Sequence, residues 1–352
     1  MNNAYIKGRG AQLNPNNKFE KLGLSYDAIE GIDDWVRPAK HTQYVQQQAQ
    51  SLVNKVTSPD VGMAYSMNPY QGCEHGCIYC YARNAYEYYG GSAGIDFESK
   101  IIVKTNAPTL LKQFLLHPQW VCTPIGLSGN TDCYQPAEKK FHLTQQLLQV
   151  CNHFNQPVSI ITKNAGILRD TELLQQMAQK QIVSVLISIT SLNEEVRRVM
   201  EPRTATAQQR LRTIHTLSNA GIPVGVMLGP MIPGLNEHEM HNIMQAAANN
   251  GASFSAYTFI RLNGTVKLLF HDWLHKNFPN KANKVWHLIE KAHNGQVNDS
   301  RFGIRMRGEG PIAQLVHEQY QKYQRKYQLH LGRHPLNCSL FTTGLPQQGS
   351  LW

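Results

Sequence analysis

The sequence lacks any apolar stretch long enough to cross a membrane. Its unbroken apolar runs are far shorter than the roughly 18 residues that a membrane-spanning helix needs. The N-terminal residues MNNAYIKGRG are too polar for a signal peptide, and the chain has no internal repeat and no long low-complexity tract. We therefore expect a cytoplasmic protein with no membrane partner.

The cysteines do not form an obvious disulfide framework. There are seven of them, an odd number, and a chain of this length without an export signal is expected to keep its thiols reduced. Some of these thiols are therefore available for chemistry.

Acidic residues are fewer than basic ones. The chain has 24 Asp and Glu against 34 Lys and Arg, which gives a net charge of +10. A basic excess favours a polyanion such as nucleic acid as a partner. However, the basic residues are scattered in short clusters, which suits an ordinary solvated surface equally well.

The central part of the chain has the pattern of an α/β protein. With 352 residues, of which 41% are hydrophobic, it can bury a full core. From about residue 60, short apolar runs alternate with longer amphipathic stretches, as in parallel strands joined by helices. The predicted strands are 64–67, 124–128, 158–162, 183–190, 224–228 and 254–260. The predicted helices between them are 137–153, 171–180, 204–219 and 237–249. Six such units fit a partial, TIM-like (β/α)6 barrel or a doubly wound sheet, and both place ligands at the carboxyl ends of the strands.

The segments on either side of this core have a different character. Residues 1–57 are rich in Asn, Gln, Lys and Gly without periodicity, which predicts an N-terminal arm that wraps around the core. After residue 265 come three helix-like segments with many His and Lys residues. We therefore divide the chain into an arm (1–57), a core (58–264) and a helical C-terminal extension (265–352).

Three cysteines, Cys73, Cys77 and Cys80, lie in the stretch MNPYQGCEHGCIYCYAR after the first predicted strand. Gly72 and Gly76 let the backbone curl so that the three sulfurs converge. Three converging thiolates hold one metal centre. A [4Fe-4S] cluster has four irons and cysteine ligands, so three cysteines leave one iron free for a small molecule.

A zinc ion is the alternative at this loop. Zinc takes four tetrahedral ligands and would recruit His75 or a distant cysteine. The chain would then be a non-catalytic, zinc-stabilised nucleic-acid-binding protein. The second C-x2-C pair of many zinc sites is missing, which favours the cluster, and the identity of the metal separates the two readings.

The spacing C-x3-C-x2-C, with the aromatic Tyr79 before the last cysteine, resembles the signature of the radical S-adenosylmethionine (SAM) superfamily. Residues 60–262 resemble its branch that contains spore photoproduct lyase and proteins called DNA repair photolyases. The stretches KGRGAQLNPNNKFE and NTDCYQPAEKK are similar to an uncharacterised bacterial subgroup of that branch.

This resemblance implies a radical SAM enzyme with two cofactors, a [4Fe-4S] cluster and SAM. Such an enzyme takes an electron from a reductant such as flavodoxin or ferredoxin and cleaves SAM to a 5′-deoxyadenosyl radical. The radical abstracts hydrogen from a substrate, for which this branch suggests nucleic acid, in lesion repair or modification. The resemblance also makes Tyr79 a cofactor contact.

The resemblance further implies a SAM pocket at the strand ends. After the second strand, residues 126–132 take the place of the Gly-Gly-Glu-like motif of the family, which makes Gly129, Thr131 and Asp132 expected cofactor contacts. Gly129 stands where spore photoproduct lyase has its hydrogen-donating cysteine. Cys133 is the nearest thiol and is the candidate catalytic residue.

The third and fourth strands end in further polar residues. Lys163 is expected to neutralise the SAM carboxylate or a substrate phosphate, the alternative being a surface lysine. Ser188 and Thr190 alternate onto one face and resemble the ribose contacts of the family, although neighbouring backbone could satisfy both hydroxyls. Arg203 is a candidate for the SAM carboxylate, because guanidinium binds carboxylates bidentately.

The loop after the fifth strand resembles the adenine-side motif G-x-I-x-G-x-x-E. Ile232, Gly234 and Glu237 match this motif, whereas Pro230 occupies the first glycine position. Ile232 and Gly234 are therefore expected to contact the cofactor.

Overall fold

The computed structural model describes residues 5–19, 41–332 and 334–343. A seven-stranded sheet forms its centre, with the strand order β10-β9-β8-β7-β6-β3-β2. The six strands from β3 to β10 in this sheet run parallel, and β2 pairs antiparallel with β3 at one edge. The strands are β2 (Val53–Lys55), β3 (Tyr65–Met67), β6 (Ile125–Leu127), β7 (Val158–Thr162), β8 (Val183–Ser188), β9 (Val224–Met231) and β10 (Phe254–Phe259).

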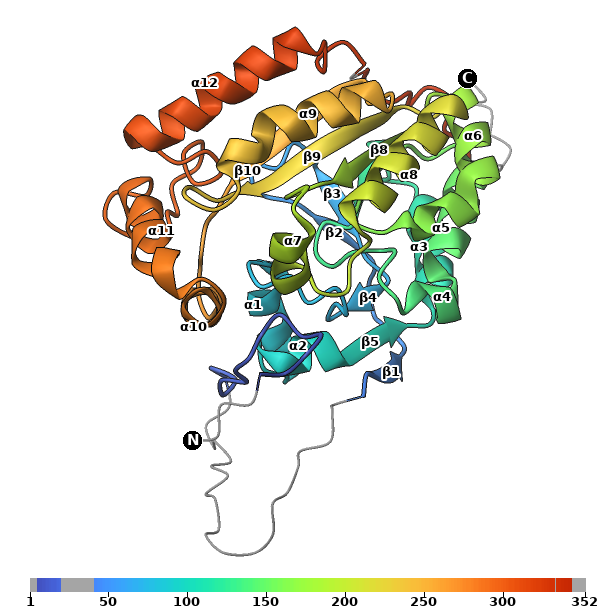
Figure 1. Cartoon of the computed structure of the whole chain (residues 1–352). Coiled ribbons are helices and arrows are strands. Elements are labelled where there is room, and N and C mark those ends of the chain that lie inside the picture. The colour runs from blue at the N-terminus through green and yellow to red at the C-terminus, as the bar shows by residue number, and fades with distance from the viewer. Residues whose placement is uncertain (1–4, 20–40, 333, 344–352) are drawn as a thin grey trace, which may run out of the picture.

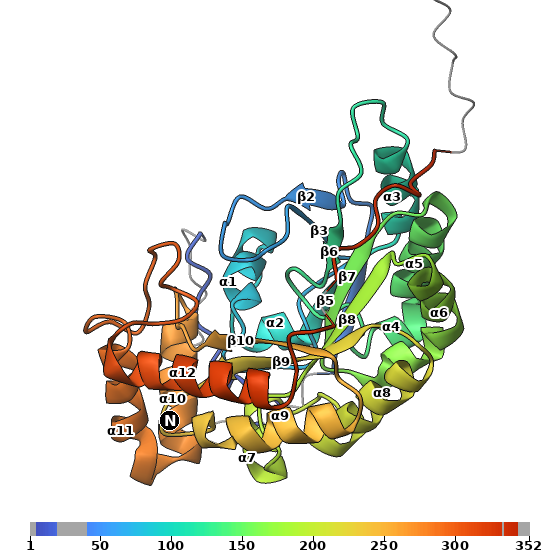
Figure 2. The same cartoon turned by 90° about the horizontal axis from the view of Figure 1, so that it is seen from above.

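The sheet curves, and helices cover its outer side, as Figure 2 shows. These helices are α3 (Ala107–Leu115), α5 (Leu143–Phe154), α6 (Thr171–Gln179), α8 (Ala207–Asn219) and α9 (Met240–Asn249). Val185 of β8 pairs with Ile160 and Val224 on the neighbouring strands, and all three are buried. Such buried, β-branched runs are typical of parallel strands covered on both faces. The partial (β/α)6 barrel is confirmed, and the doubly wound alternative is not needed.

Several element boundaries differ from the prediction for local reasons. The helix expected at 137–153 is two helices, α4 (Glu138–Phe141) and α5, because His142 adopts a left-handed conformation with φ of 53°. Helix α8 begins at residue 207 and not 204, because Thr206 and Gln209 form a capping box. The last predicted helix begins with a 3-10 turn, Glu237–Glu239, before α9.

A second, three-stranded sheet lies under the core and was not predicted. Its order is β1-β5-β4, with β1 (Gln43–Gln47), β5 (Lys100–Lys104) and β4 (Tyr70–Gln71). β1 comes from the expected N-terminal arm and pairs in parallel with β5. Between β4 and β5 lie two short helices, α1 (Ala82–Tyr86) and α2 (Ile95–Ser99).

The C-terminal part contains the three expected helices, α10 (Val266–Asn277), α11 (Pro279–Lys291) and α12 (Gly310–Lys326). Figure 1 shows α12 above α9, with α10 and α11 beside the open edge at β10. No helix in the described ranges is both long and apolar enough to span a membrane.

Candidate functional site

The cysteine loop lies between β4 and α1, at the carboxyl end of the barrel. Cys73 and Cys77 are buried and Cys80 is half-buried. Gly72 and Gly76 have φ angles of 77° and 66°, the left-handed region that favours glycine. The curled loop that the two glycines predicted is therefore present, although the short strand β4 comes between it and β3.

A buried arginine holds the carbonyl groups on the back of this loop. Arg83 is fully buried, and its Nε donates to the Cys77 carbonyl at 3.0 Å while Nη2 donates to the Gly76 carbonyl at 3.1 Å. Nη2 also pairs with the Glu98 carboxylate at 2.5 Å, and Nη1 bonds two carbonyls before α2. Arg83 thereby fixes the loop, which itself has no regular secondary structure.

The three thiols suit an iron–sulfur cluster better than a single ion. Burial raises the pKa of each cysteine thiol, so the ligands become thiolates only when a metal centre takes the place of their protons. Among the described residues, no three His, Cys, Asp or Glu side chains are placed to hold one metal ion. A zinc ion needs its four ligands about 2.0–2.3 Å from one point, whereas the cysteines of a cubane bind different irons.

Tyr79 faces a buried carboxylate, Glu201. The Tyr79 hydroxyl and the Thr190 hydroxyl both donate to Glu201 Oε1, and Arg210 Nη2 donates to Glu201 Oε2 at 2.5 Å. Burial alone disfavours the charged carboxylate, but Arg210, Lys163 and these hydrogen bonds together lower the pKa of Glu201 to about 2. Glu201 is therefore a fixed negative charge beside Tyr79.

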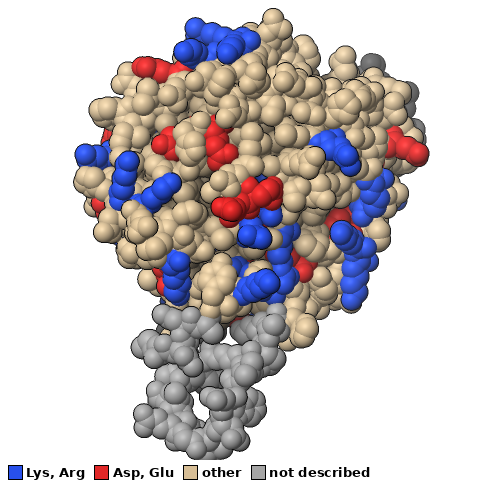
Figure 3. Space-filling view, viewed as in Figure 1, with Lys and Arg blue, Asp and Glu red and all other residues tan. Residues whose placement is uncertain are grey.

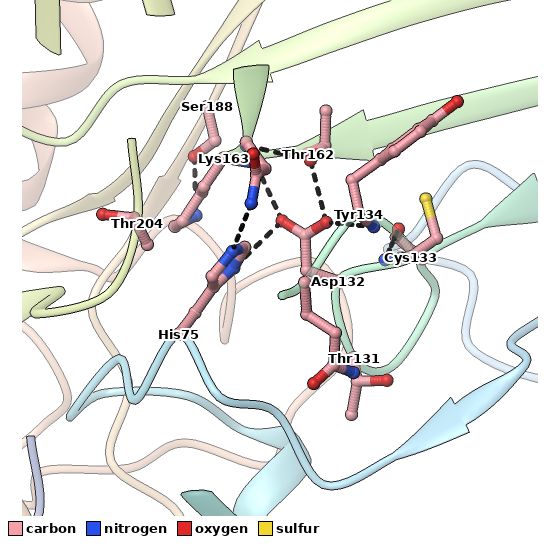
Figure 4. A network of polar contacts seen from close by, with 12 residues as sticks. His75, Thr131, Asp132, Cys133, Tyr134, Thr162, Lys163, Ser188 and Thr204 are labelled. Atoms are coloured by element: carbon pink, nitrogen blue, oxygen red, sulfur yellow. Dashed lines mark hydrogen bonds and ion pairs between the residues drawn. The ribbon is translucent and has the colours of Figure 1, made fainter. Parts of the chain in front are cut away.

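A second network joins the cysteine loop to the ends of β6, β7 and β8 (Figure 4). Lys163 Nζ donates to the Ser188 hydroxyl at 2.7 Å and lies 6.0 Å from the centre of the Tyr79 ring. The Asp132 carboxylate accepts from the Thr162 hydroxyl and from the Lys163 backbone N–H, both at 2.8 Å. His75, from the cysteine loop, lies 3.3 Å from Asp132.

Asp132 keeps its charge in this network. Burial opposes ionisation, but His75 and the hydrogen bonds from Lys163 and Thr162 lower the pKa of Asp132 to about 2. The structure therefore brings together five residues that the sequence singled out, Tyr79, Asp132, Lys163, Ser188 and Thr190.

The glycine and threonine of the β6 loop shape its backbone. A Cβ on Gly129 would lie 2.6 Å from the Ser66 side chain, so only glycine fits beside β3. The Tyr81 hydroxyl donates to the Gly129 carbonyl at 2.7 Å. Thr131 is buried and donates to the Tyr70 carbonyl at 2.8 Å. Any contact of these two residues with SAM stays a prediction.

Ile232 and Gly234 both lie in tightly packed parts of the fold, and their contact with the cofactor stays a prediction. Ile232 is fully buried in the main core. A Cβ on Gly234 would meet Leu288 and Val285 of α11, at 3.0 Å and 3.3 Å. The loop after β9 therefore packs against the C-terminal extension at Gly234.

Arg203 and Cys133 make their contacts outside the network around Asp132. Arg203 donates to the Gly8 carbonyl at 3.1 Å and to the Thr42 hydroxyl at 3.4 Å, so its guanidinium is engaged by the N-terminal segment. Cys133 is fully buried in the main apolar core, and in Figure 4 it lies on the opposite side of Asp132 from His75. Its position gives no support to a catalytic role.

The sequence reasoning missed Arg83, Glu98, Glu201 and Arg210 as parts of the site. All four are charged side chains that the fold buries, and a buried charge must find a partner. Glu201 precedes Pro202 and Arg203, where the sequence drew attention to the exposed arginine instead of the buried carboxylate.

Comparison with known proteins agrees with this geometry. A family model described as "Radical SAM superfamily" matches residues 67–247. An uncharacterized protein of Mycobacterium tuberculosis (strain H37Rv) is 32% identical over 245 residues, which cover 69% of this chain and 72% of that protein. The chain belongs to the radical SAM superfamily.

Two further comparisons concern more distant proteins. A "Radical SAM Nalpha-GlyT isomerase" of Pseudomonas phage M6 is 22% identical, over 83% of this chain and 57% of the isomerase. The solved structure of spore photoproduct lyase complexed with dinucleoside spore photoproduct has a TM-score of 0.58 and 16% identity, covering 81% of this chain and 79% of that one. The fold is therefore similar to that of spore photoproduct lyase.

Membership in the superfamily implies a [4Fe-4S] cluster and SAM. Cys73, Cys77 and Cys80 fit the cluster because they are the three sulfur donors of one buried loop. The reading as a non-catalytic zinc protein is thereby set aside, and the chain is a radical SAM enzyme.

Proposed function

We propose that this radical SAM enzyme cleaves SAM reductively and removes a hydrogen atom from a nucleic-acid substrate. The observation that carries the proposal is the meeting of Tyr79 with Lys163 and Ser188 beside the cysteine loop. These side chains come from three separate segments, and they offer a cation, a hydroxyl and an aromatic face at one point.

The charge of Lys163 and the hydroxyl groups near it suit the polar parts of SAM. Lys163 carries the positive charge that a carboxylate needs, and Ser188 orients the ammonium group of Lys163. Thr190 is already bonded to Glu201, so we assign it to holding Glu201 and Tyr79 in place. When bound, the cluster supplies the electron that cleaves a carbon–sulfur bond of SAM to methionine and a 5′-deoxyadenosyl radical. The electron itself requires a reductant of the flavodoxin or ferredoxin type.

Arginines at the barrel mouth support nucleic acid as the substrate class. Figure 3 shows Lys and Arg side chains scattered over the side of the molecule seen in Figure 1, with acidic residues between them, so general basicity is a weak argument. Arg261 is a stronger one. It follows β10, it is half-buried near Tyr81, Arg305 and Asp60, and burial together with the charge of Arg305 lowers its pKa. A second guanidinium beside a single carboxylate leaves positive charge that suits a phosphodiester.

Aromatic rings lie at the same mouth. Arg305 stacks on Phe302, and the Phe302 and Tyr81 side chains are both more than half exposed. Exposed rings beside guanidinium groups are suited to stacking with bases. The dinucleoside ligand of spore photoproduct lyase is a further reason to place the substrate in this class.

Deuterium transfer tests the proposal. The protein is reconstituted anaerobically and given SAM, dithionite and DNA or RNA from cells grown in deuterated medium, and 5′-deoxyadenosine is analysed by mass spectrometry. We expect deuterium in the deoxyadenosine from one of the two nucleic acids. Arg261→Ala should lower this transfer, whereas Arg212→Ala, an exposed arginine on α8, should leave it unchanged. Label that comes only from deuterated protein or small metabolites would refute a nucleic-acid substrate.

A further inference from the structure

The N-terminal segment 8–17 lies against the outer side of the cysteine loop and of the chain that follows it. Figure 1 shows this segment in dark blue beside α1 and α2. Arg9, Gly10, Ala11 and Asn17 are buried. The segment is remote in sequence from the core, yet it packs like part of it.

Glu98 joins this segment to the cysteine loop. Its carboxylate accepts the backbone N–H groups of Gly10 and Ala11, at 3.0 Å and 2.8 Å. The same carboxylate pairs with Arg83, the residue that holds the carbonyls of Gly76 and Cys77. One fully buried carboxylate therefore connects the N-terminal backbone, through Arg83, to the backbone of a cluster ligand.

Gly10 also touches the cysteine loop directly. A Cβ on Gly10 would lie 1.9 Å from the carbonyl oxygen of Gly76, which no side chain could tolerate. A Cβ on Gly76 would in turn lie 2.8 Å from the Glu98 carboxylate and 3.3 Å from Pro202. The loop is thus enclosed from behind by three separate parts of the chain.

The rest of the segment continues along the chain between α1 and α2. Asn14 accepts the Asp96 N–H at 3.0 Å, and the Ser92 hydroxyl donates to the Pro15 carbonyl at 2.5 Å. Asn17 donates to the carbonyls of Glu87 and Gly91, at 2.7 Å and 3.1 Å. At the other end, Arg203 holds the Gly8 carbonyl and donates its own backbone N–H to the His75 carbonyl at 3.3 Å.

We infer that residues 8–17 form an N-terminal clasp that positions the three cluster ligands, with Glu98 as the positioning residue through which it acts. The loop from Gly72 to Tyr81 contains no helix or strand, and the backbone bonds that join its cysteines to loop neighbours are long turn bonds, from Gly76 N–H to Cys73 and from Cys80 N–H to Cys77, both at 3.3 Å. Partners outside the ligand shell orient metal ligands, and their loss typically weakens the site without removing it. The clasp provides such partners from a segment that precedes the barrel.

The same contacts give Arg203 a new role. As a ligand of the SAM carboxylate, Arg203 would affect SAM binding and leave the cluster unchanged. As the residue that fixes one end of the clasp, it affects retention of the cluster and leaves SAM affinity of the loaded protein unchanged. The two roles are therefore separable by experiment.

Release of iron from the full-length, reconstituted protein tests the clasp. The variants are Gly10→Ala, Glu98→Gln, Asn17→Ala and Arg203→Ala, and iron loss to a chelator is followed anaerobically by the visible absorbance of the cluster. Two controls lie away from the loop. Glu239→Gln alters another buried carboxylate that accepts backbone N–H groups, and Gly332→Ala crowds the Ser253 side chain to a similar degree.

We expect Gly10→Ala and Glu98→Gln to lose iron about tenfold faster than the wild type. The Gly10→Ala apoprotein should unfold at the temperature of the Gly332→Ala control, whereas Glu98→Gln also loses the buried ion pair with Arg83 and should unfold at a lower temperature. Arg203→Ala should keep its SAM affinity in the loaded fraction. Iron loss at the wild-type rate would overturn the inference, as would equal acceleration in the two controls. If Glu98→Gln does not fold, Gly10→Ala and Asn17→Ala decide the question by the same comparison.

Discussion

Glu201 fixes three side chains beside the cysteine loop in one arrangement. It has no exposed surface, and its two oxygens accept from Tyr79, Thr190 and Arg210. Tyr79 stands between Cys77 and Cys80 in the sequence, and the position of this carboxylate sets the direction of its ring. The aromatic residue of the cysteine motif is therefore held from outside the motif.

Removing the Glu201 carboxylate should destabilise the protein strongly. Glu201→Ala leaves the buried guanidinium of Arg210 without its ion-pair partner, and breaking a buried pair in this way costs roughly 3–5 kcal/mol. Urea unfolding of the apoprotein measures this change. A loss of unfolding free energy under about 1 kcal/mol, which is common for surface substitutions, would show that Glu201 does not hold these side chains in place.

Acid should weaken the fold through the same carboxylate. The pKa of Glu201 is lowered from 4.5 to about 2 in the folded chain, so between these values the unfolded chain binds more protons. Its contribution is therefore fully present above pH 4.5 and is lost as the pH falls towards 2. We expect the free energy of unfolding to fall more steeply with decreasing pH in the wild type than in Glu201→Gln. Parallel curves for the two proteins would contradict this.

At the scale of elements, the loop 301–306 bridges the open side of the partial barrel. The sheet ends at β10 on one side and at β2 on the other. Asp60, which follows β2, accepts the Gly303 N–H at 2.6 Å and pairs with Arg305 at 2.5 Å. The Phe259 N–H of β10 bonds the Met306 carbonyl at 2.9 Å. The loop therefore joins the two edges.

Asp60→Ala should loosen this bridge and leave the sheet intact. The substitution removes both bonds to the loop, so we expect faster hydrogen exchange at residues 301–305. Exchange in β7 and β8 should stay unchanged, because these strands lie in the centre of the sheet. A loop with wild-type protection in Asp60→Ala would mean that other contacts hold it.

The sequence predicted the elements with strong patterns and missed those that depend on distant partners. The six parallel strands were predictable because short buried apolar runs alternate with amphipathic helices. β1 and β4 were not predictable. The residues of β1 are mostly polar, β4 has too few residues to form a pattern, and both are strands because they pair with β5. Lys163 and Ser188 were found because they stand at strand ends. Arg83 and Glu98 were missed because their shared burial becomes visible only when the folded chain brings Gly10 to Gly76.

For the whole molecule, charge alone is a poor guide to the partner. The net charge of +10 is scattered over the face seen in Figure 3. The half-buried arginines at the mouth are a more specific signal, because burial strengthens their interaction with a phosphate.

If the substrate is nucleic acid, as we propose, the salt dependence of its binding should come from few phosphate contacts. If Arg261 binds one phosphate, Arg261→Ala should reduce the slope of log affinity against log salt by about 1. Fluorescence anisotropy with a labelled single-stranded oligonucleotide measures the slope, with Arg212→Ala as the control. An unchanged slope in Arg261→Ala would place the phosphate contacts elsewhere.

Formation of 5′-deoxyadenosine tests most directly whether this chain cleaves SAM at the cysteine loop. The protein is reconstituted with iron and sulfide under anaerobic conditions, reduced with dithionite and given SAM with and without nucleic acid, and the products are separated by liquid chromatography. We predict 5′-deoxyadenosine and methionine from the wild type and none from Cys80→Ala. A wild-type protein that carries a full cluster and yet forms no deoxyadenosine, with or without nucleic acid, would contradict reductive cleavage of SAM by this enzyme.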